Sequence, residues 1–142
     1  RHCARMFNVG ANLTTPMFGV VIRKAYGLGV QAMCGASSLV PFFTVAWPTA
    51  EFAGMNIDGG VKLSSRRELM AIEDAEERKA AYDRKVSEAY EKARAVNSGG
   101  NAYGIDDIID PADTRSWLIR GLKSLPAAMP RDRKKRAHVD TW

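Results

Sequence analysis

The stretch that decides the fold is residues 20–33, Val-Val-Ile-Arg-Lys-Ala-Tyr-Gly-Leu-Gly-Val-Gln-Ala-Met. An apolar, β-branched run leads into a turn that contains Gly27 and Gly29, and a run of small residues follows. This order is typical of a strand that ends in a tight turn and continues as a helix. A helix that begins here presents unpaired backbone N–H groups and the positive end of its dipole. We therefore expect function to lie at the turn 26–29.

Composition and charge describe an ordinary globular chain with a basic end. The 142 residues suffice for one domain with a core, and 46% are hydrophobic and 26% charged. Residues 131–136, Arg-Asp-Arg-Lys-Lys-Arg, supply most of the net charge of +5. No aromatic residue interleaves these charges, which favours a solvated tail over nucleic-acid binding. The sequence also lacks a long apolar span and a signal-peptide pattern, so we expect neither membrane insertion nor secretion.

Cysteine usage points to a reducing, cytoplasmic setting. Cys3 and Cys34 make no disulfide framework and no metal-ligand spacing. Cys34 falls in the helix expected after the turn, where a small packed residue is favoured over a nucleophile.

Apolar patterning predicts an α/β chain with short crossovers. The apolar runs are continuous rather than alternating, which is typical of parallel strands that are covered on both faces. Asp58 is expected to cap a helix near residues 59–61, and Asp110 a helix with Pro111 in its first position. The apolar face of the last helix is expected to hold Trp117, Leu118, Gly121, Leu122 and Leu125. The expected helices are 2–13, 29–37 and 74–97, and the expected strands are 17–23, 39–46 and 105–110.

Side chains with catalytic chemistry are scarce. The histidines, His2 and His138, lie at opposite ends of the chain, and no metal motif is present. Arg23 and Lys24 at the end of the first strand suit either an anion site or a solvated strand end. The backbone remains, because N–H groups inside a helix start can stabilise a developing oxyanion by several kcal/mol in a dry pocket.

Three motifs, in this order along the chain, carry a family resemblance. They are Ile-Arg-Lys-Ala-Tyr-Gly at 22–27, Ala-Trp-Pro-Thr-Ala-Glu at 46–51 and Asp-Asp-Ile-Ile-Asp-Pro-Ala-Asp-Thr-Arg at 106–115. Together they resemble the carboxyltransferase (β) subunit of biotin-dependent acyl-CoA carboxylases, the propionyl-CoA carboxylase family. The resemblance covers residues 1–125, and the basic tail 126–142 lies beyond it.

The resemblance implies a crotonase-like (ClpP/crotonase) ββα superhelix. Subunits of the family hold two such domains, and residues 1–125 resemble the C-terminal part of the second, which is therefore a partial domain. The implied activity moves a carboxyl group from carboxybiotin, on a separate carrier domain, to the α-carbon of an acyl-CoA. The implied partners are the N-terminal crotonase-like domain of another subunit in a homohexamer and the biotin carboxyl carrier and biotin carboxylase components. No metal is implied in this segment.

The resemblance also assigns roles at the turn. The N–H groups of Leu28 and Gly29 correspond to the family's donors to the ureido oxygen of biotin, so CO2 can leave and the biotin nitrogen can take the α-proton of the acyl-CoA. The chain departs from the family pattern Tyr-Gly-Gly-Ala-Tyr-Asp at positions 28–31, which bears on the acyl chain that is accepted. Trp47 is expected to be structural. The residues expected to bind substrate are Tyr26, Gly27, Val30, Gln31, Gly54 and Met55.

Two alternatives to a carboxylase stay open. One is a decarboxylase of the same family, which runs the reaction toward free CO2. The other is a non-catalytic oligomerisation segment, because the apolar helix faces Tyr82–Val96 and Trp117–Leu125 need partners. In either case the isolated chain is expected to be inactive.

Overall fold

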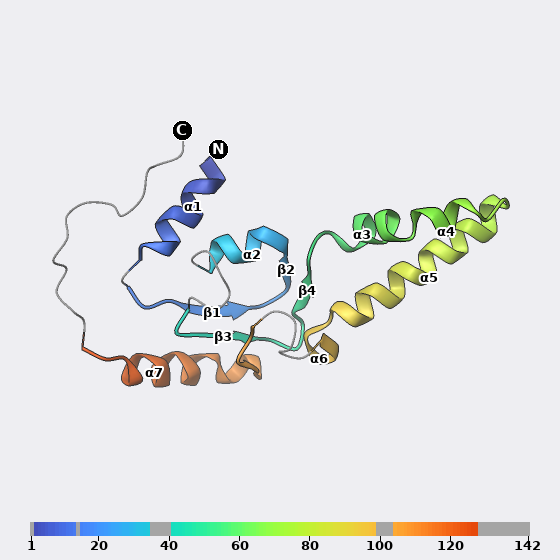
Figure 1. Ribbon diagram of the computed structural model, residues 1–142. Coiled ribbons are helices and arrows are strands. Elements are labelled where there is room, and N and C mark those ends of the chain that lie inside the picture. The colour runs from blue at the N-terminus through green and yellow to red at the C-terminus, as the bar shows by residue number, and fades with distance from the viewer. Residues whose placement is uncertain (1, 14, 35–40, 99–103, 128–142) are drawn as a thin grey trace.

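The computed structural model describes residues 2–13, 15–34, 41–98 and 104–127 (Figure 1). Helices and short strands alternate along the chain, as the sequence predicts for an α/β protein. The helices are α1 His2–Ala11, α2 Gly27–Met33, α3 Ile57–Ser64, α4 Arg66–Met70, α5 Ala75–Ala93, α6 Ala95–Ser98, the 3₁₀ helix η1 Pro111–Asp113 and α7 Thr114–Ser124. The strands are β1 Phe18–Val21, β2 Lys24–Tyr26, β3 Phe43–Ala46, β4 Glu51–Ala53 and β5 Asp107–Ile108.

Within the described residues the strands form two small parallel sheets. One has the order β1-β3-β5, with Phe18 opposite Phe43 and Ala46 opposite Ile108. The other pairs β2 with β4, with Tyr26 opposite Ala53. The parallel pairing expected from the continuous apolar runs is therefore confirmed.

The central strand β3 organises the core, and all four of its residues are buried. Val45 and Ala46 are fully inaccessible. One cluster of apolar side chains joins Ala46 to the side of α2, through Val30, and a second joins Val45 to α7, through Trp117. Figure 1 shows α2 and α7 on opposite sides of β1 and β3. This double cover explains why the strand carries no alternation of polar residues.

The sequence analysis missed both strands of the second sheet. The helix expected at 29–37 begins at Gly27, immediately after β2, and its described part ends at Met33. Residues 35–40, which complete that helix and open the strand expected at 39–46, lie outside the described residues. Strands as short as β2 and β4 leave no periodic signal in the sequence, because their pairing with each other defines them.

The helix expected at 74–97 is two helices that meet at Arg94. Arg94 has an extended conformation with φ −60° and ψ 136°, and it forms an antiparallel bridge with Glu51. The next N–H, of Ala95, donates to the carbonyl of Ala50 at 2.8 Å. The β4 strand therefore captures the chain here, a tertiary contact that the periodicity of the sequence does not encode. Val96 is consequently 49% exposed and does not continue the apolar face that was expected.

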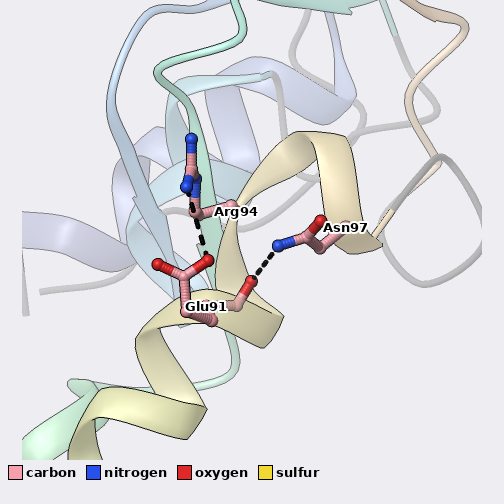
Figure 2. A network of polar contacts seen from close by, with 3 residues as sticks. All are labelled: Glu91, Arg94 and Asn97. Atoms are coloured by element: carbon pink, nitrogen blue, oxygen red, sulfur yellow. Dashed lines mark hydrogen bonds and ion pairs between the residues drawn. The ribbon is translucent and has the colours of Figure 1, made fainter.

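Side-chain bonds secure this break (Figure 2). The Arg94 guanidinium lies 3.3 Å from a carboxylate oxygen of Glu91, and the Asn97 amide donates to the Glu91 carbonyl at 2.7 Å. The last turn of α5 is thereby tied to α6 across the extended residue.

The helix caps follow the sequence in part. Asp110 accepts from the Ala112 N–H at 2.8 Å, which confirms the expected cap, although the first turn is 3₁₀. The cap expected at Asp58 is wrong, since Asn56 accepts from the Gly59 N–H at 2.9 Å and Asp58 lies in the first turn of α3. Asparagine and aspartate cap equally well, so composition alone does not choose between them.

Four helices, α3, α4, α5 and α7, flank the sheets in different ways. The hairpin of α3, α4 and α5 extends away from the sheets as an arm (Figure 1). On α7 the expected face packs through Trp117, Leu118 and Gly121, but Leu122 is 60% exposed, so its place on that face was wrong. None of the helices in the described ranges has the length and apolar composition that a membrane span requires.

Gly121 gives the first prediction. A β-carbon there would lie 2.6 Å from Phe43 and 2.7 Å from Phe18, so α7 packs on the sheet only because this side chain is absent. We expect Gly121→Ala to lower the free energy of unfolding by about 1–2 kcal/mol, since overpacking outweighs the gain in helix propensity. Denaturant unfolding of the chain measures this change.

Gly60→Ala in α3 is the matched control. Its β-carbon would meet Met55 at an ordinary contact distance of 3.4 Å, so we expect no loss of stability. Equal losses in the two variants would contradict the packing explanation.

Candidate functional site

The turn after β2 is built on Tyr26 and Gly27. Tyr26 is the residue before α2, and its side chain makes no cap hydrogen bond to the helix. Gly27 has a φ of 55°, the left-handed conformation that favours glycine. Leu28 and Gly29 lie in the first turn of α2, where backbone N–H groups have no partner within the helix. The structure therefore places Leu28 and Gly29, which the sequence analysis expects to be donors, at the start of a helix.

A close backbone contact connects this turn to the end of β4. A β-carbon at Gly27 would lie 2.7 Å from the Gly54 carbonyl oxygen, a distance that no other residue tolerates. The register of β2 on β4, with Tyr26 opposite Ala53, brings these glycines together. Thus the structure places three expected site residues, Tyr26, Gly27 and Gly54, side by side.

An open groove of about 720 Å³ begins at Gly54 and runs along the arm. Its walls come from β4, α3 and α5 and are mostly apolar. Gly54 and Met55 line it, together with one cation, Lys92. Met55 is half exposed, so its side chain is accessible from solvent.

The remaining expected site residues point in different directions. The Leu28 side chain is 69% exposed, and no atom lies within 4 Å of the β-carbon position of Gly29. Gln31 is also exposed, whereas Val30 packs against the apolar cluster of β1 and β3. The side-chain positions of Leu28 and Gly29 are therefore open to solvent.

A hydrogen bond that the sequence did not reveal lies beside the turn. The Tyr26 hydroxyl donates to Glu51 Oε2 at 2.6 Å. Burial, and then this bond to Glu51, raise the pKa of the Tyr26 phenol far above its ordinary value of 10.0. Glu51 closes the motif at 46–51, but the 25 residues that separate it from Tyr26 hide the pairing.

A second phenol–carboxylate pair lies on the arm. Tyr90 donates from α5 to Asp58 Oδ2 on α3 at 2.9 Å, and this bond raises the pKa of the Tyr90 phenol. The Tyr82 hydroxyl donates to the Asp58 carbonyl at 3.3 Å. Asp58 therefore ties α3 to α5 instead of capping α3.

Other candidates from the sequence have structural roles. Cys34 is buried, which confirms its packed position, and burial raises the pKa of its thiol. The Trp47 indole N–H donates to Thr114 Oγ1 at 2.9 Å and packs on the β3 cluster, as a structural residue would. Arg23 and Lys24 are exposed. In the described part of the chain, no group of His, Cys, Asp and Glu side chains is arranged to hold a metal.

Comparison with known proteins gives the family. The family model described as the carboxyl transferase domain matches residues 1–139. The chain belongs to the carboxyl transferase family. Its resemblance to carboxyltransferase subunits, stated from three motifs, is thus confirmed.

Named relatives cover most of this carboxyl transferase chain. It is 34% identical over 123 residues to the methylmalonyl-CoA carboxyltransferase 12S subunit of Propionibacterium freudenreichii subsp. shermanii, and the match covers 87% of this chain and 23% of that subunit. It is also 34% identical over 125 residues to the propionyl-CoA carboxylase carboxyltransferase subunit of Haloferax mediterranei, and this match covers 88% of this chain and 23% of that subunit. The chain therefore spans about a quarter of the length of these relatives.

Solved structures agree with the fold of this carboxyl transferase segment. The transcarboxylase 12S crystal structure matches with a TM-score of 0.75 and 31% identity, over 98% of this chain and 26% of that one. A single-chain, multi-domain long-chain acyl-CoA carboxylase matches with a TM-score of 0.68 and 42% identity, over 82% of this chain and 11% of that chain. The expected crotonase-like fold of a partial domain is confirmed by these neighbours.

The Tyr26 phenol predicts how stability depends on pH. Its pKa is raised in the folded chain, so the neutral phenol stabilises the fold at pH values below about 10, and this contribution is lost as the pH rises further. We expect the Tyr26→Phe variant to lose stability less steeply than the parent between about pH 9 and pH 12. Urea unfolding at several pH values measures the two slopes, and equal slopes would contradict a partly buried, hydrogen-bonded phenol.

Proposed function

We propose that this segment supplies the biotin side of a carboxyl transfer from carboxybiotin to the α-carbon of an acyl-CoA. Family membership and the names of the relatives support the reaction class. The observation that carries the proposal is the place of Leu28 and Gly29 in the first turn of α2, where both side-chain positions are open to solvent.

The residues of the turn fit the ureido group of biotin. Two adjacent N–H groups can both donate to the one oxygen of the planar ureido group. The positive end of the α2 dipole favours the negative charge that develops on this oxygen. When bound, biotin carries the carboxyl group and supplies the nitrogen that takes the α-proton of the acyl-CoA. Leu28 and Gly29 hold the oxygen, and Gly27 fixes the direction of both N–H bonds through its contact with Gly54. Such donors contribute about 3–4 kcal/mol each in comparable sites.

The groove beside the turn provides the wall of the proposed biotin pocket. Gly54 and Met55 lie at its edge, next to Gly27. We assign Gln31, whose side chain is exposed on α2, to contacts that select the acyl chain, and Val30 to the support of that helix from the core. We also place the end of the domain near residue 125, because α7 ends at Ser124.

The rest of the proposed site comes from other chains. The transcarboxylase 12S structure is described as a hexamer assembly and a multienzyme core. We propose a homo-oligomer of this kind, in which the N-terminal crotonase-like domain of another subunit closes the space above Gly29. A biotin carboxyl carrier and a biotin carboxylase subunit complete the system, in the cytoplasm. The isolated segment is then inactive.

Two other functions compete with this one. A relative named methylmalonyl-CoA decarboxylase subunit alpha, from Propionigenium modestum, is 30% identical over 125 residues, which keeps the decarboxylase direction as a second candidate. The exposed apolar residues Ile119 and Leu122 on α7 suit the third, an oligomerisation segment without catalysis.

A graft tests the proposal. Residues 1–125 replace the matching segment of the Propionibacterium 12S subunit, and transfer of labelled carboxyl from carboxybiotin to propionyl-CoA, which gives labelled methylmalonyl-CoA, is measured. Gly29→Pro removes one donor without breaking a bond within the helix, since Gly29 lies in the first turn. We expect it to lower kcat by about 10²–10³-fold.

Gly29→Ala is the control, because it keeps the N–H and its β-carbon meets no atom within 4 Å. We expect it to retain the parent rate. A parent graft that assembles but transfers nothing would overturn the carboxyltransferase proposal, and label released as CO2 would favour the decarboxylase. Full turnover in Gly29→Pro would overturn the role of the backbone donor.

A further inference from the structure

We propose that Glu51 is a positioning residue that acts through Tyr26 to hold the turn of the backbone donors. This inference rests on the proposed function of that turn. It adds a residue, Glu51, to which the sequence analysis gave no role, and it changes the role of Tyr26 from a substrate contact to an anchor.

The geometry of the pair is specific. Tyr26 is the last residue of β2, and Glu51 is the first residue of β4, where it lies opposite Lys24. The Tyr26 side chain therefore reaches diagonally back across the sheet to Glu51 Oε2, at 2.6 Å. Such a short bond to a carboxylate is of the stronger, charge-assisted kind.

This bond directs the Tyr26 side chain away from the helix start. The residue at an N-cap commonly uses a short polar side chain to accept from the second or third N–H of the helix. Tyr26 occupies that position and makes no cap hydrogen bond, and its long side chain instead carries its hydroxyl to Glu51. The Tyr26 side chain therefore does not occupy the first-turn N–H groups of Leu28 and Gly29.

Glu51 is a firm anchor because its backbone is held on both sides. Its N–H donates to the Arg23 carbonyl at 2.8 Å, toward β1 and β2. On its other side it forms the antiparallel bridge with Arg94, and the adjacent Ala50 carbonyl accepts from Ala95. The Tyr26 hydroxyl is thus bonded to a residue whose backbone contacts both the residue before β2 and the end of α5.

Three constraints then converge on one turn. Tyr26 is paired with Ala53 in the sheet, and Gly27 lies close to the Gly54 carbonyl. The Tyr26 phenol, bonded to Glu51, adds a third contact that restricts movement of the turn. A displacement of about 1 Å in such a site costs about 10²-fold in rate, so the loss of one constraint in three gives a smaller, measurable effect.

The arm offers a matched control. Tyr90 donates to Asp58 with the same chemistry, a phenol on a carboxylate at 2.9 Å, but this bond joins α5 to α3 and not β2 to β4. Tyr90 also lines a small cavity together with Glu51, so the control lies close to the pair that it is compared with. Tyr90→Phe therefore removes an equivalent bond from a neighbouring place.

The kinetic experiment uses the graft described above. We expect Tyr26→Phe and Glu51→Ala each to lower kcat about ten-fold, with the KM for the acyl-CoA unchanged, because the role proposed for the pair is to hold the backbone donors on the biotin side. Glu51→Gln keeps an oxygen acceptor and is expected to restore most of the rate, and Tyr90→Phe is expected to match the parent. Equal loss in Tyr90→Phe, full activity in Tyr26→Phe, or no rescue by glutamine would each overturn the positioning role.

A second measurement separates this inference from the proposed function. Amide hydrogen exchange is followed by NMR in the 142-residue chain itself. The amides that report the turn are bonded ones: the Glu51 N–H donates to Arg23 and the Cys34 N–H donates within α2 to Val30. We expect Tyr26→Phe to speed exchange at Glu51 and Cys34 while Val45 in the core keeps its protection, and Tyr90→Phe to leave all three unchanged. Unchanged exchange at Glu51 and Cys34 in Tyr26→Phe would overturn the inference even in an active graft, whereas the expected change in an inactive graft would count against the carboxyltransferase proposal alone.

Discussion

The structure depends on one close approach of backbone to backbone, between Gly27 and the carbonyl of Gly54. Because a β-carbon at Gly27 would lie 2.7 Å from that oxygen, the two short strands β2 and β4 can converge at their ends only with glycine in this place. The convergence sets where α2 begins. It also opens the groove along the arm at the same point, so the helix start and the groove share one edge. Both features of the candidate site follow from this single contact.

The sequence predicted the parts of the fold whose determinants are local. Continuous apolar runs gave the parallel strands β1 and β3, and the Asp110-Pro111 pair marked the start of the last helical segment. The second sheet could not be predicted, since β2 and β4 exist through their pairing. The break at Arg94 was missed for a related reason. The Ala95 N–H, which would bond within a continuous helix, donates instead to the carbonyl of Ala50, the residue before β4.

The candidate site divides in the same way. The turn and its glycines were predicted from spacing and motif, and the structure brings Tyr26, Gly27 and Gly54 together. The partnership of Tyr26 with Glu51 was not predicted, because a hydrogen bond across 25 residues requires the register of the sheet to be known first. Val30, which the resemblance assigns to substrate binding, packs in part against the core, a contact that the motif does not show.

The exposure of Leu28 has a consequence for how such a site evolves. Its side chain is 69% exposed while its N–H lies in the first turn of α2. The side chain and the backbone of Leu28 are therefore under separate structural constraints. An amide donor is encoded by the path of the chain and survives replacement of the side chain by any residue except proline. Side chains around the turn can therefore drift toward new ligands while the donors stay in place. Apart from proline at the donor positions themselves, mutations that abolish the donors must change the path of the chain, as a side chain at Gly27 would.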